Sequence, residues 1–343
     1  MADEKLTYAI LGTGAVGGLY GSFLARSGCR VHFLARSDYA HIRQHGLQVE
    51  SPWGDFHLPQ VHCYSSTMDM PEVDVVIVAW KTTDNAHLAE ALEPLCGAET
   101  AVLVLQNGWD VERDAAECVG SERVLGGCCF LCCHKAGPGH IRHLDYGRIV
   151  FGEYADQARG KLTPRMRAIA RDFSDAGIDI EPSVDLRDAR WRKLMWNIPY
   201  NGLSVVLNAD TQQLMHDPAS ALLVASLMLE VRQAAEHHGC RIEEEYVDKL
   251  LEDTRRMVPY DSSMRLDYRH RRPIEVEAIV GNPLRAAQHT GYHPRQMEML
   301  YHQLCFLDRH NRKAAAVADL ETVAQDPDQS HHHQQKDGQQ QVS

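Results

Sequence analysis

The chain has 343 residues, with 35 Lys and Arg against 47 Asp and Glu, so its formal net charge is −12. This length predicts about two domains at roughly 150 residues each. The acidic charge and the lack of an apolar run of about 18 residues argue against nucleic-acid and membrane partners.

Strand-like and helix-like patterns alternate through the first half of the chain. Apolar, β-branched runs at 8–11, 30–35, 73–80 and 101–105 predict buried parallel strands, and 124–131 predicts a further strand. Helices are expected from the glycine-rich stretch after the first run through residue 25, and at 87–95. This alternation predicts an α/β fold of the Rossmann type, with a doubly wound parallel sheet.

The pattern changes near residue 184, where strand signals end. Helical periodicity then covers 186–208, 218–239 and 262–289, with a shorter stretch near 294–309. We therefore expect a dinucleotide-binding domain at 1–183 and an all-helical substrate and catalytic domain at 184–318. The last residues, 319–343, are mostly Gln, His and Asp, and a disordered tail is expected there.

The amino terminus lacks the basic region of a secretory signal peptide. The ten cysteines are therefore expected to be reduced thiols in the cytoplasm. Cys129 and Cys132 have a C-x2-C spacing, but no second ligand pair follows at a matching distance. The cluster Cys128–Cys133 is better explained as a buried strand, and no metal site is predicted.

A phosphate-binding turn is indicated where the first strand meets the first helix. Gly12, Gly14 and Gly17 form G-x-G-x-x-G in this strand–helix context. The first glycine permits the tight turn, the second lets a pyrophosphate approach the backbone, and the third allows close packing of helix on strand. The alternative is a glycine-rich turn without a ligand. The predicted cofactor contacts here are Gly12, Thr13, Gly14, Ala15, Val16 and Gly17.

The end of the second strand indicates which dinucleotide binds. An NAD site places an acidic residue there for the ribose hydroxyls, but this strand ends in Arg36 and Ser37, and Asp38 comes one residue too late. A guanidinium can pair with a 2′-phosphate in bidentate fashion. NADP(H) is therefore favoured over NAD(H), the alternative for Arg36 being a solvated surface arginine.

A polar stripe crosses the first helix of the second half. Lys193, Asn197 and Asn201 are spaced i, i+4, i+8 among apolar residues, so they share one helix face. A lysine beside a bound carbonyl can protonate the alkoxide that forms there. The alternative is that Lys193 belongs to a solvated charged run. Pro199 lies in the same helix, where we expect a kink.

A second helical segment contains Ser263 and Glu275. A serine can bind a carboxylate, and a glutamate can orient a lysine or a hydroxyl. Spacing alone does not distinguish this segment from a capped amphipathic helix.

Taken together, these motifs and their order resemble the 2-dehydropantoate 2-reductase (ketopantoate reductase) family over about residues 6–310. The resemblance implies a helical domain similar to the C-terminal domain of 6-phosphogluconate dehydrogenase. It also implies that Arg36 contacts the 2′-phosphate, and that Lys81 and Asn107 contact the cofactor. Lys193 would be the general acid, and Glu275 a catalytic and cofactor-binding residue. The implied substrate residues are Lys193, Asn197, Asn201 and Ser263.

The family resemblance leads to the expectation of NADPH-dependent reduction of 2-dehydropantoate to (R)-pantoate in the cytoplasm, by a homodimer formed through the helical domain. Three features depart from the family pattern: Thr211 where an asparagine often contacts substrate, Pro199 in the catalytic helix, and the cysteine cluster. The alternatives are a reductase of another 2-oxo acid, a 3-hydroxy acid dehydrogenase of the same architecture, and a non-catalytic NADP(H) sensor.

Overall fold

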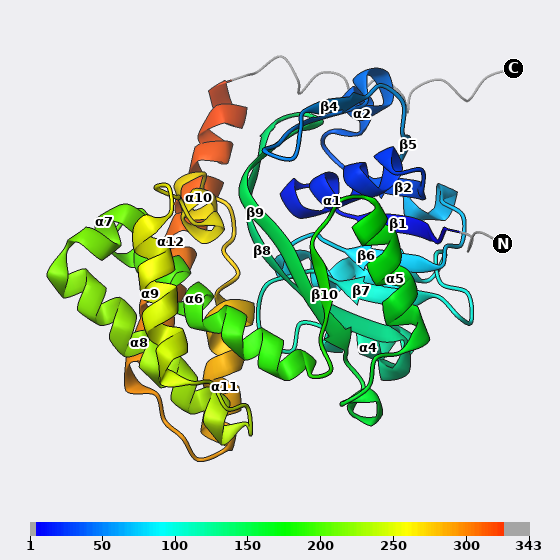
Figure 1. Ribbon diagram of the computed structural model, residues 1–343. Helices are drawn as coiled ribbons and strands as arrows, with labels where there is room; N and C mark the ends of the chain where they lie inside the picture. The colour runs from blue at the N-terminus through cyan, green and yellow to red at the C-terminus, as the bar shows by residue number, and fades with distance from the viewer. Residues whose placement is uncertain (1–4, 326–343) are drawn as a thin grey trace, which may run out of the picture.

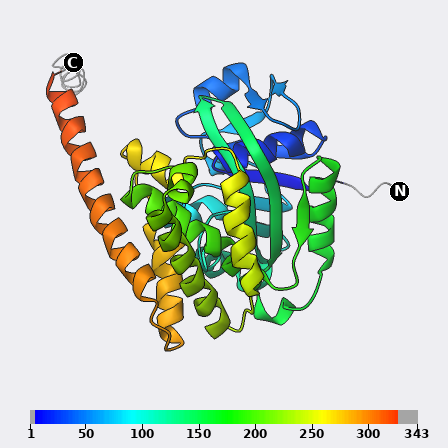
Figure 2. The same ribbon diagram turned by 60° about the vertical axis from the view of Figure 1, so that its left-hand side comes forward.

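The computed structural model describes the backbone of residues 5–325 and the side chains of residues 5–314. A twisted sheet with its covering helices lies beside a bundle of helices (Figure 1). Figure 2 shows the long helix α12 (Arg295–Gln325) on the side of the bundle away from the sheet.

The sheet in this part of the chain has ten strands in the order β4-β3-β9-β8-β7-β6-β1-β2-β5, with β10 paired to β9. From β8 to β5 every neighbouring pair is parallel, whereas β8 with β9 and β3 with β4 are antiparallel. The strands are β1 (Thr7–Leu11), β2 (Arg30–Leu34), β3 (Leu47–Glu50), β4 (Phe56–Leu58), β5 (His62–Tyr64), β6 (Val75–Val78), β7 (Ala101–Val104), β8 (Val124–Gly137), β9 (His140–Glu153) and β10 (Ile180–Pro182).

Both faces of the sheet are covered, as the unbroken apolar runs of its central strands require. Strand β1 lies between β2 and β6, and its last four residues are fully buried. One face packs against α1 (Ala15–Arg26) and α5 (Pro164–Asp175), and the other against α3 (Leu88–Leu92) and α4 (Arg113–Val119). The short α2 (Tyr39–His45) follows β2.

Helix α6 (Leu186–Val206) is the centre of the helical half. It contacts α7, α8, α10 and α12, and it also packs against β8 and β9. The helix continues through Pro199, which lies inside it. The remaining helices are α7 (Thr211–His216), α8 (Pro218–His237), α9 (Glu244–Arg256), α10 (Ser263–Arg269) and α11 (Asn282–His289).

The predicted strands are confirmed, but the fifth extends to Gly137 and forms a long hairpin with β9 that was not predicted. Strand β9 lies inside the sheet, between β8 and β3, but it has no continuous apolar run. Its middle buries His143 and exposes Leu144 and Tyr146, which obscures the hydrophobic pattern of a strand. Strands β3, β4, β5 and β10 were also missed, because each is short and none is an unbroken apolar run like β6 and β7.

The prediction of one helix over 262–289 is wrong. Helix α10 ends at Arg269, a π-helical turn covers Glu277–Gly281, and α11 follows. Arg271 has a left-handed φ of 55°, and Pro273 disfavours helical geometry in the residue before it. The segment therefore bends where periodicity alone predicted continuity. Helices α7 and α9 were not predicted.

The last strand ends at Pro182 and α6 begins at Leu186, on either side of the proposed domain boundary at 183/184. Helix α12 extends to Gln325, into the segment expected to be a tail. The rest of that predicted tail lies outside the described residues. Within the described chain, no helix combines the length and the apolar character needed to span a bilayer.

Candidate active site

A cavity of about 1440 Å³ opens between the sheet and the helical half. Its floor follows the carboxyl ends of β1, β2, β6 and β7, which is where open α/β sheets bind ligands, and its other wall comes from α6, α9 and α10. All but one of the predicted site residues line it, Gly17 being the exception. Those that line it are Gly12, Thr13, Gly14, Ala15, Val16, Arg36, Lys81, Asn107, Lys193, Asn197, Asn201, Ser263 and Glu275.

The glycine turn has the geometry of a dinucleotide-binding site. Gly12 has a φ of +101°, and a Cβ there would lie 2.6 Å from the backbone nitrogen of Trp80. A Cβ on Gly17 would lie 2.3 Å from the Gly12 carbonyl oxygen, so the helix packs directly on the turn. A Cβ on Gly14 would meet nothing within 4 Å. Open space above Gly14, at the amino end of the 12-residue α1, fits a pyrophosphate.

Arg36 and Asp38 differ in their availability to a ligand. The Arg36 side chain is 71% exposed, and its Nη2 donates to Asp84 Oδ2 at 2.6 Å across the cavity mouth. Asp38 is buried and accepts hydrogen bonds from Lys135 Nζ at 2.7 Å and from the Gly139 amide at 3.1 Å. Burial alone would raise the pKa of Asp38, but these hydrogen bonds outweigh it and lower the pKa. Asp38 is thus engaged with the β8–β9 hairpin, while Arg36 faces the cavity.

Lys193 lies between aromatic rings on the helical wall. Its Nζ is 4.6 Å from the centroid of the Phe130 ring and 5.8 Å from that of Trp196. The first ring comes from β8 and the second from α6. The ammonium is therefore held by ring faces, an arrangement that leaves its protons available to a ligand in the cavity.

Burial lowers the pKa of Lys193, and the neighbouring Arg190 lowers it further. The sulfur atoms of Cys128, Cys129 and Cys132 also lie near it, but burial raises the pKa of each of these thiols. They are neutral near pH 7 and supply no charge that would hold the proton on the amine. The surroundings of Lys193 therefore favour its giving up a proton.

The two asparagines predicted from different halves of the chain meet in the cavity. Asn197 Nδ2 donates to Asn107 Oδ1 at 3.4 Å. Asn107 follows the end of β7, whereas Asn197 is one helical turn beyond Lys193 on α6. Asn197 and Asn201 are both about 97% buried and line the cavity. The amide stripe therefore faces the cofactor side of the site and is not a solvated helix face.

Lys81 and Glu275 each make a contact across the cavity that the sequence did not indicate. Lys81 Nζ pairs with Asp267 of α10, whose other carboxylate oxygen accepts from Arg272 Nε at 2.8 Å. Glu275 Oε1 accepts from both the amide and the hydroxyl of Thr82, each at 2.9 Å. Burial raises the pKa of Glu275, although the bonds from Thr82 act in the opposite direction. Glu275 thus contacts the segment after β6, and no bond to Lys193 is seen among the described residues.

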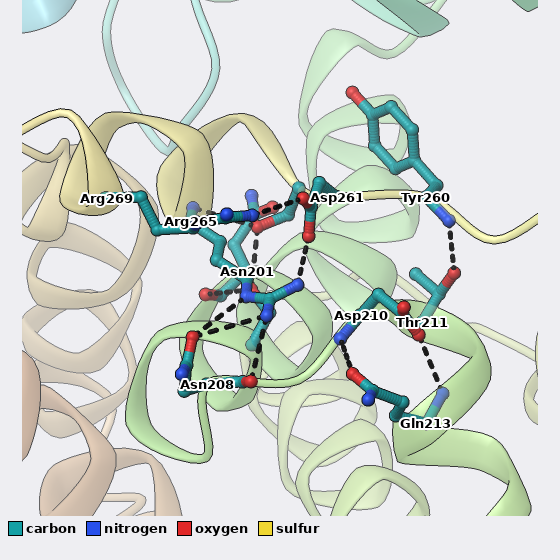
Figure 3. Close-up of polar contacts among 11 residues, drawn as sticks. Asn201, Asn208, Asp210, Thr211, Gln213, Tyr260, Asp261, Arg265 and Arg269 are labelled. Atoms are coloured by element: carbon teal, nitrogen blue, oxygen red, sulfur yellow. Dashed lines mark hydrogen bonds and ion pairs between the residues drawn. The ribbon is translucent and has the colours of Figure 1, made fainter.

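Ser263 lies at the start of α10, in a segment that Figure 3 shows held from both sides. Thr211 Oγ1 accepts from the Tyr260 amide at 3.1 Å, and the Thr211 amide donates to the Tyr260 carbonyl at 3.2 Å. On the other side, Arg265 Nη2 donates to the carbonyl of Asn208, in the turn after α6, at 2.9 Å (Figure 3). Thr211 is buried and does not line the cavity, whereas Tyr260 does. Thr211 therefore supports the pocket wall through the backbone of Tyr260.

Sequence reasoning assigned no role to Phe130, Tyr260 and Asp267, which line the cavity. It also assigned none to Thr82, which donates to Glu275. Their partners are far away in the chain: Lys81 is 186 residues from Asp267, and Thr82 is 193 residues from Glu275. No spacing within one helix or strand could signal such pairs. The cysteine cluster contains free thiols, and no group of metal-ligating side chains occurs in the described part of the chain.

Comparison with known proteins gives consistent matches over nearly the whole chain. The family described as ketopantoate reductase PanE/ApbA matches residues 8–156, and its C-terminal family matches 185–307. A 2-dehydropantoate 2-reductase from Nostoc sp. is 51% identical over 313 residues, covering 91% of this chain and 98% of the relative.

Solved structures agree with this fold. A 2-dehydropantoate 2-reductase from Geobacter metallireducens superposes with a TM-score of 0.84 at 40% identity, covering 87% of this chain and 99% of that one. D-mandelate dehydrogenase, solved with NADH and anilino(oxo)acetate, superposes with a TM-score of 0.79 over 89% of this chain and 99% of its own. At 20% identity the second likeness shows a shared fold alone.

Proposed function

This chain belongs to the ketopantoate reductase family, and on that premise we propose that it reduces the C2 ketone of 2-dehydropantoate to (R)-pantoate with NADPH. The observation that carries the proposal is the cavity itself. It brings the glycine turn and Arg36 from one half together with Lys193, Asn197 and Asn201 from the other. The reaction would supply pantoate for pantothenate and coenzyme A synthesis.

The residues around the turn support the cofactor assignment. When bound, NADPH supplies the hydride. The amino end of α1 and the open space above Gly14 would hold the pyrophosphate, and Arg36 would pair with the 2′-phosphate. We expect Asn107, Lys81 and Glu275 to contact the nicotinamide end of the cofactor. They follow β7, β6 and α10, respectively, and they line the same cavity as Lys193.

Lys193 would act as the general acid. As the C2 carbonyl accepts a hydride it becomes an alkoxide, and the Lys193 ammonium donates one proton to that oxygen and becomes a neutral amine. Asn197 and Asn201 would bind the substrate's polar groups, and Ser263 its carboxylate. Glu275 would position the cofactor through the segment at Thr82, since its observed contact is there.

A different 2-oxo acid remains the alternative substrate, and one observation favours it. Thr211 supports Tyr260, so an aromatic residue stands at the cavity beside Ser263. The 3-hydroxy acid and sensor alternatives have no comparable feature. A cytoplasmic location and a homodimer remain predictions from the sequence.

The deciding experiment is steady-state turnover on a panel of 2-oxo acids, with NADPH and NADH in parallel. We expect the highest kcat/KM with 2-dehydropantoate and NADPH. A higher kcat/KM for another branched 2-oxo acid would identify that acid as the preferred substrate. A preference for NADH would contradict the role assigned to Arg36. Tight NADPH binding without turnover on any acid would favour the sensor.

A further inference from the structure

A buried ion pair joins α6 to the loop that follows β7. Arg190 Nε donates to Glu112 Oε1 at 2.9 Å, and Arg190 Nη2 contacts the same oxygen. The Arg190 side chain is 4% exposed and that of Glu112 is 2% exposed. Isolated charges are expensive to bury, so such a pair persists only when its geometry is well satisfied.

The remaining guanidinium hydrogens of Arg190 reach the end of β7. Nη1 donates to the Gln106 carbonyl at 2.7 Å, and Nη2 is 3.4 Å from the Val104 carbonyl. Asn107 is the next residue after Gln106, and Lys193 lies one helical turn after Arg190 on α6. One side chain thus connects the peptide that precedes Asn107 to the helix that presents Lys193.

The surrounding packing is shaped around this pair. A Cβ on Gly126 of β8 would lie 1.8 Å from Glu112 Oε1, so the carboxylate occupies space that only glycine leaves open. Next to the pair, the Trp109 and Trp191 rings lie 4.5 Å apart, centroid to centroid. The Trp109 amide donates to the Ala278 carbonyl at 2.9 Å. The loop carrying Asn107 is therefore fastened to the helical half at both Arg190 and Ala278.

From this geometry we propose that Arg190, with Glu112, is a positioning pair that fixes the general acid Lys193 in register with Asn107 across the two halves of the site. Neither residue reaches the main cavity. The pair acts through the β7 carbonyls and through α6, and it sets the approach of the ammonium to the carbonyl being reduced. This inference rests on the proposed function, because it assumes that Lys193 is the proton donor.

The charge of Arg190 adds a second effect. The groups that face Lys193 are the neutral thiols of Cys128, Cys129 and Cys132 on β8 and the guanidinium of Arg190 on its own helix. Arg190 is thus the positively charged group in this set, and its charge favours the neutral form of the Lys193 amine. Removing its charge would raise the pKa of Lys193, whereas moving the positive charge slightly would leave that pKa nearly unchanged.

The test compares R190K, the neutral double variant R190M/E112Q, and the control R187M. Arg187 is on the same helix, is half-exposed, and has its Nε 3.8 Å from Asp185 Oδ1. For each protein, kcat, both KM values, the pH profile of kcat and the melting temperature are measured.

In R190K we expect kcat to fall at least tenfold, with the KM for NADPH within about twofold of wild type and the alkaline limb of the profile unmoved. In the double variant kcat should fall similarly and that limb should move to higher pH. R187M should match wild type.

If R190K keeps wild-type kcat, or loses activity only in proportion to its unfolded fraction, the positioning role is wrong, whether or not the double variant folds. An equal loss in R187M would also contradict it. A wild-type enzyme without NADPH-dependent turnover would instead overturn the proposed function.

Discussion

The surroundings of Lys193 differ from those of a solvated surface lysine. Its Nζ faces the Phe130 ring at 4.6 Å, and burial lowers its pKa. Lys193→Ala should lower kcat by about 10²–10⁴, the usual contribution of a positioned general acid. NADPH affinity, measured by fluorescence titration, should stay within a few-fold of wild type. An equal loss in affinity and turnover would contradict the general-acid role.

The lowered pKa of Lys193 also predicts a pH dependence. The proton donor must be charged, so reduction should proceed at full rate below its pKa and fall tenfold per pH unit above it. Because burial and Arg190 lower that pKa, the decline should begin at a lower pH than an ordinary lysine would give. The reverse reaction, oxidation of pantoate, needs the neutral amine, so its rate should rise with pH up to the pKa of Lys193. A profile of kcat that stays flat through the alkaline range would argue for another donor.

We expect Arg36, which follows β2 at the cavity, to determine the choice between NADPH and NADH. Arg36→Ala should raise the KM for NADPH about tenfold or more and leave that for NADH nearly unchanged, because only NADPH carries the 2′-phosphate. Arg43→Ala is the matched control, since Arg43 is an exposed arginine on α2 that does not line the cavity. Equal effects of Arg36→Ala on the KM values of both cofactors would show that the guanidinium does not bind the 2′-phosphate.

At the scale of elements, the segment before α10 depends on a contact with α7. Thr211→Val keeps the shape of the side chain but removes the oxygen that accepts from the Tyr260 amide (Figure 3). We expect a loss of about 1 kcal/mol in the free energy of unfolding, together with a several-fold rise in the KM for the 2-oxo acid. Urea unfolding and steady-state kinetics measure the two effects.

Thr290→Val provides the comparison, because Thr290 Oγ1 donates to the Ala287 carbonyl at the end of α11, away from the cavity. It should lower stability without changing that KM. If both variants leave the KM unchanged, the Thr211 contact is structural only.

The elements also show which sequence signals are dependable. The strand β1 and the glycine turn were predictable because a run buried on both faces and a φ above zero each restrict the residue types allowed. The β8–β9 hairpin was not, since its second strand buries His143 and exposes Leu144 and Tyr146, so residue type does not report burial there. The break after α10 depends on Arg271 and Pro273, a local conformation that the amphipathic pattern conceals.

At the scale of the whole molecule, the site belongs to neither half alone. Lys81 pairs with Asp267, and Glu275 bonds Thr82, so each half completes the other's wall. A ligand that binds between them should stabilise the folded chain. At 100 times its Kd, NADPH should add about 2.7 kcal/mol and raise the melting temperature by several degrees. Differential scanning fluorimetry measures the shift, and NADH at the same concentration should give a smaller one. Equal shifts would contradict the preference for NADPH.

The net charge of −12 coexists with a site for small anions. Arg36, Lys81 and Lys193 line the same cavity, although Arg36 pairs with Asp84 and Lys81 with Asp267, so cations are present where a phosphate and a carboxylate would bind. The overall charge therefore bears on bulk polyanions and says nothing against NADPH or a 2-oxo acid.

By itself the sequence determined the fold class, the phosphate turn and the polar stripe of α6, because each follows from a short-range rule: burial on two faces, backbone freedom at glycine, and helical spacing. Only the tertiary structure decided which residues face one another across the cavity. Asn107 meets Asn197, Glu275 meets Thr82 and not Lys193, and Arg190 meets Glu112. Such pairs are fixed by how two separately patterned halves pack, and a buried charge chooses its partner by proximity in space, not by distance along the chain.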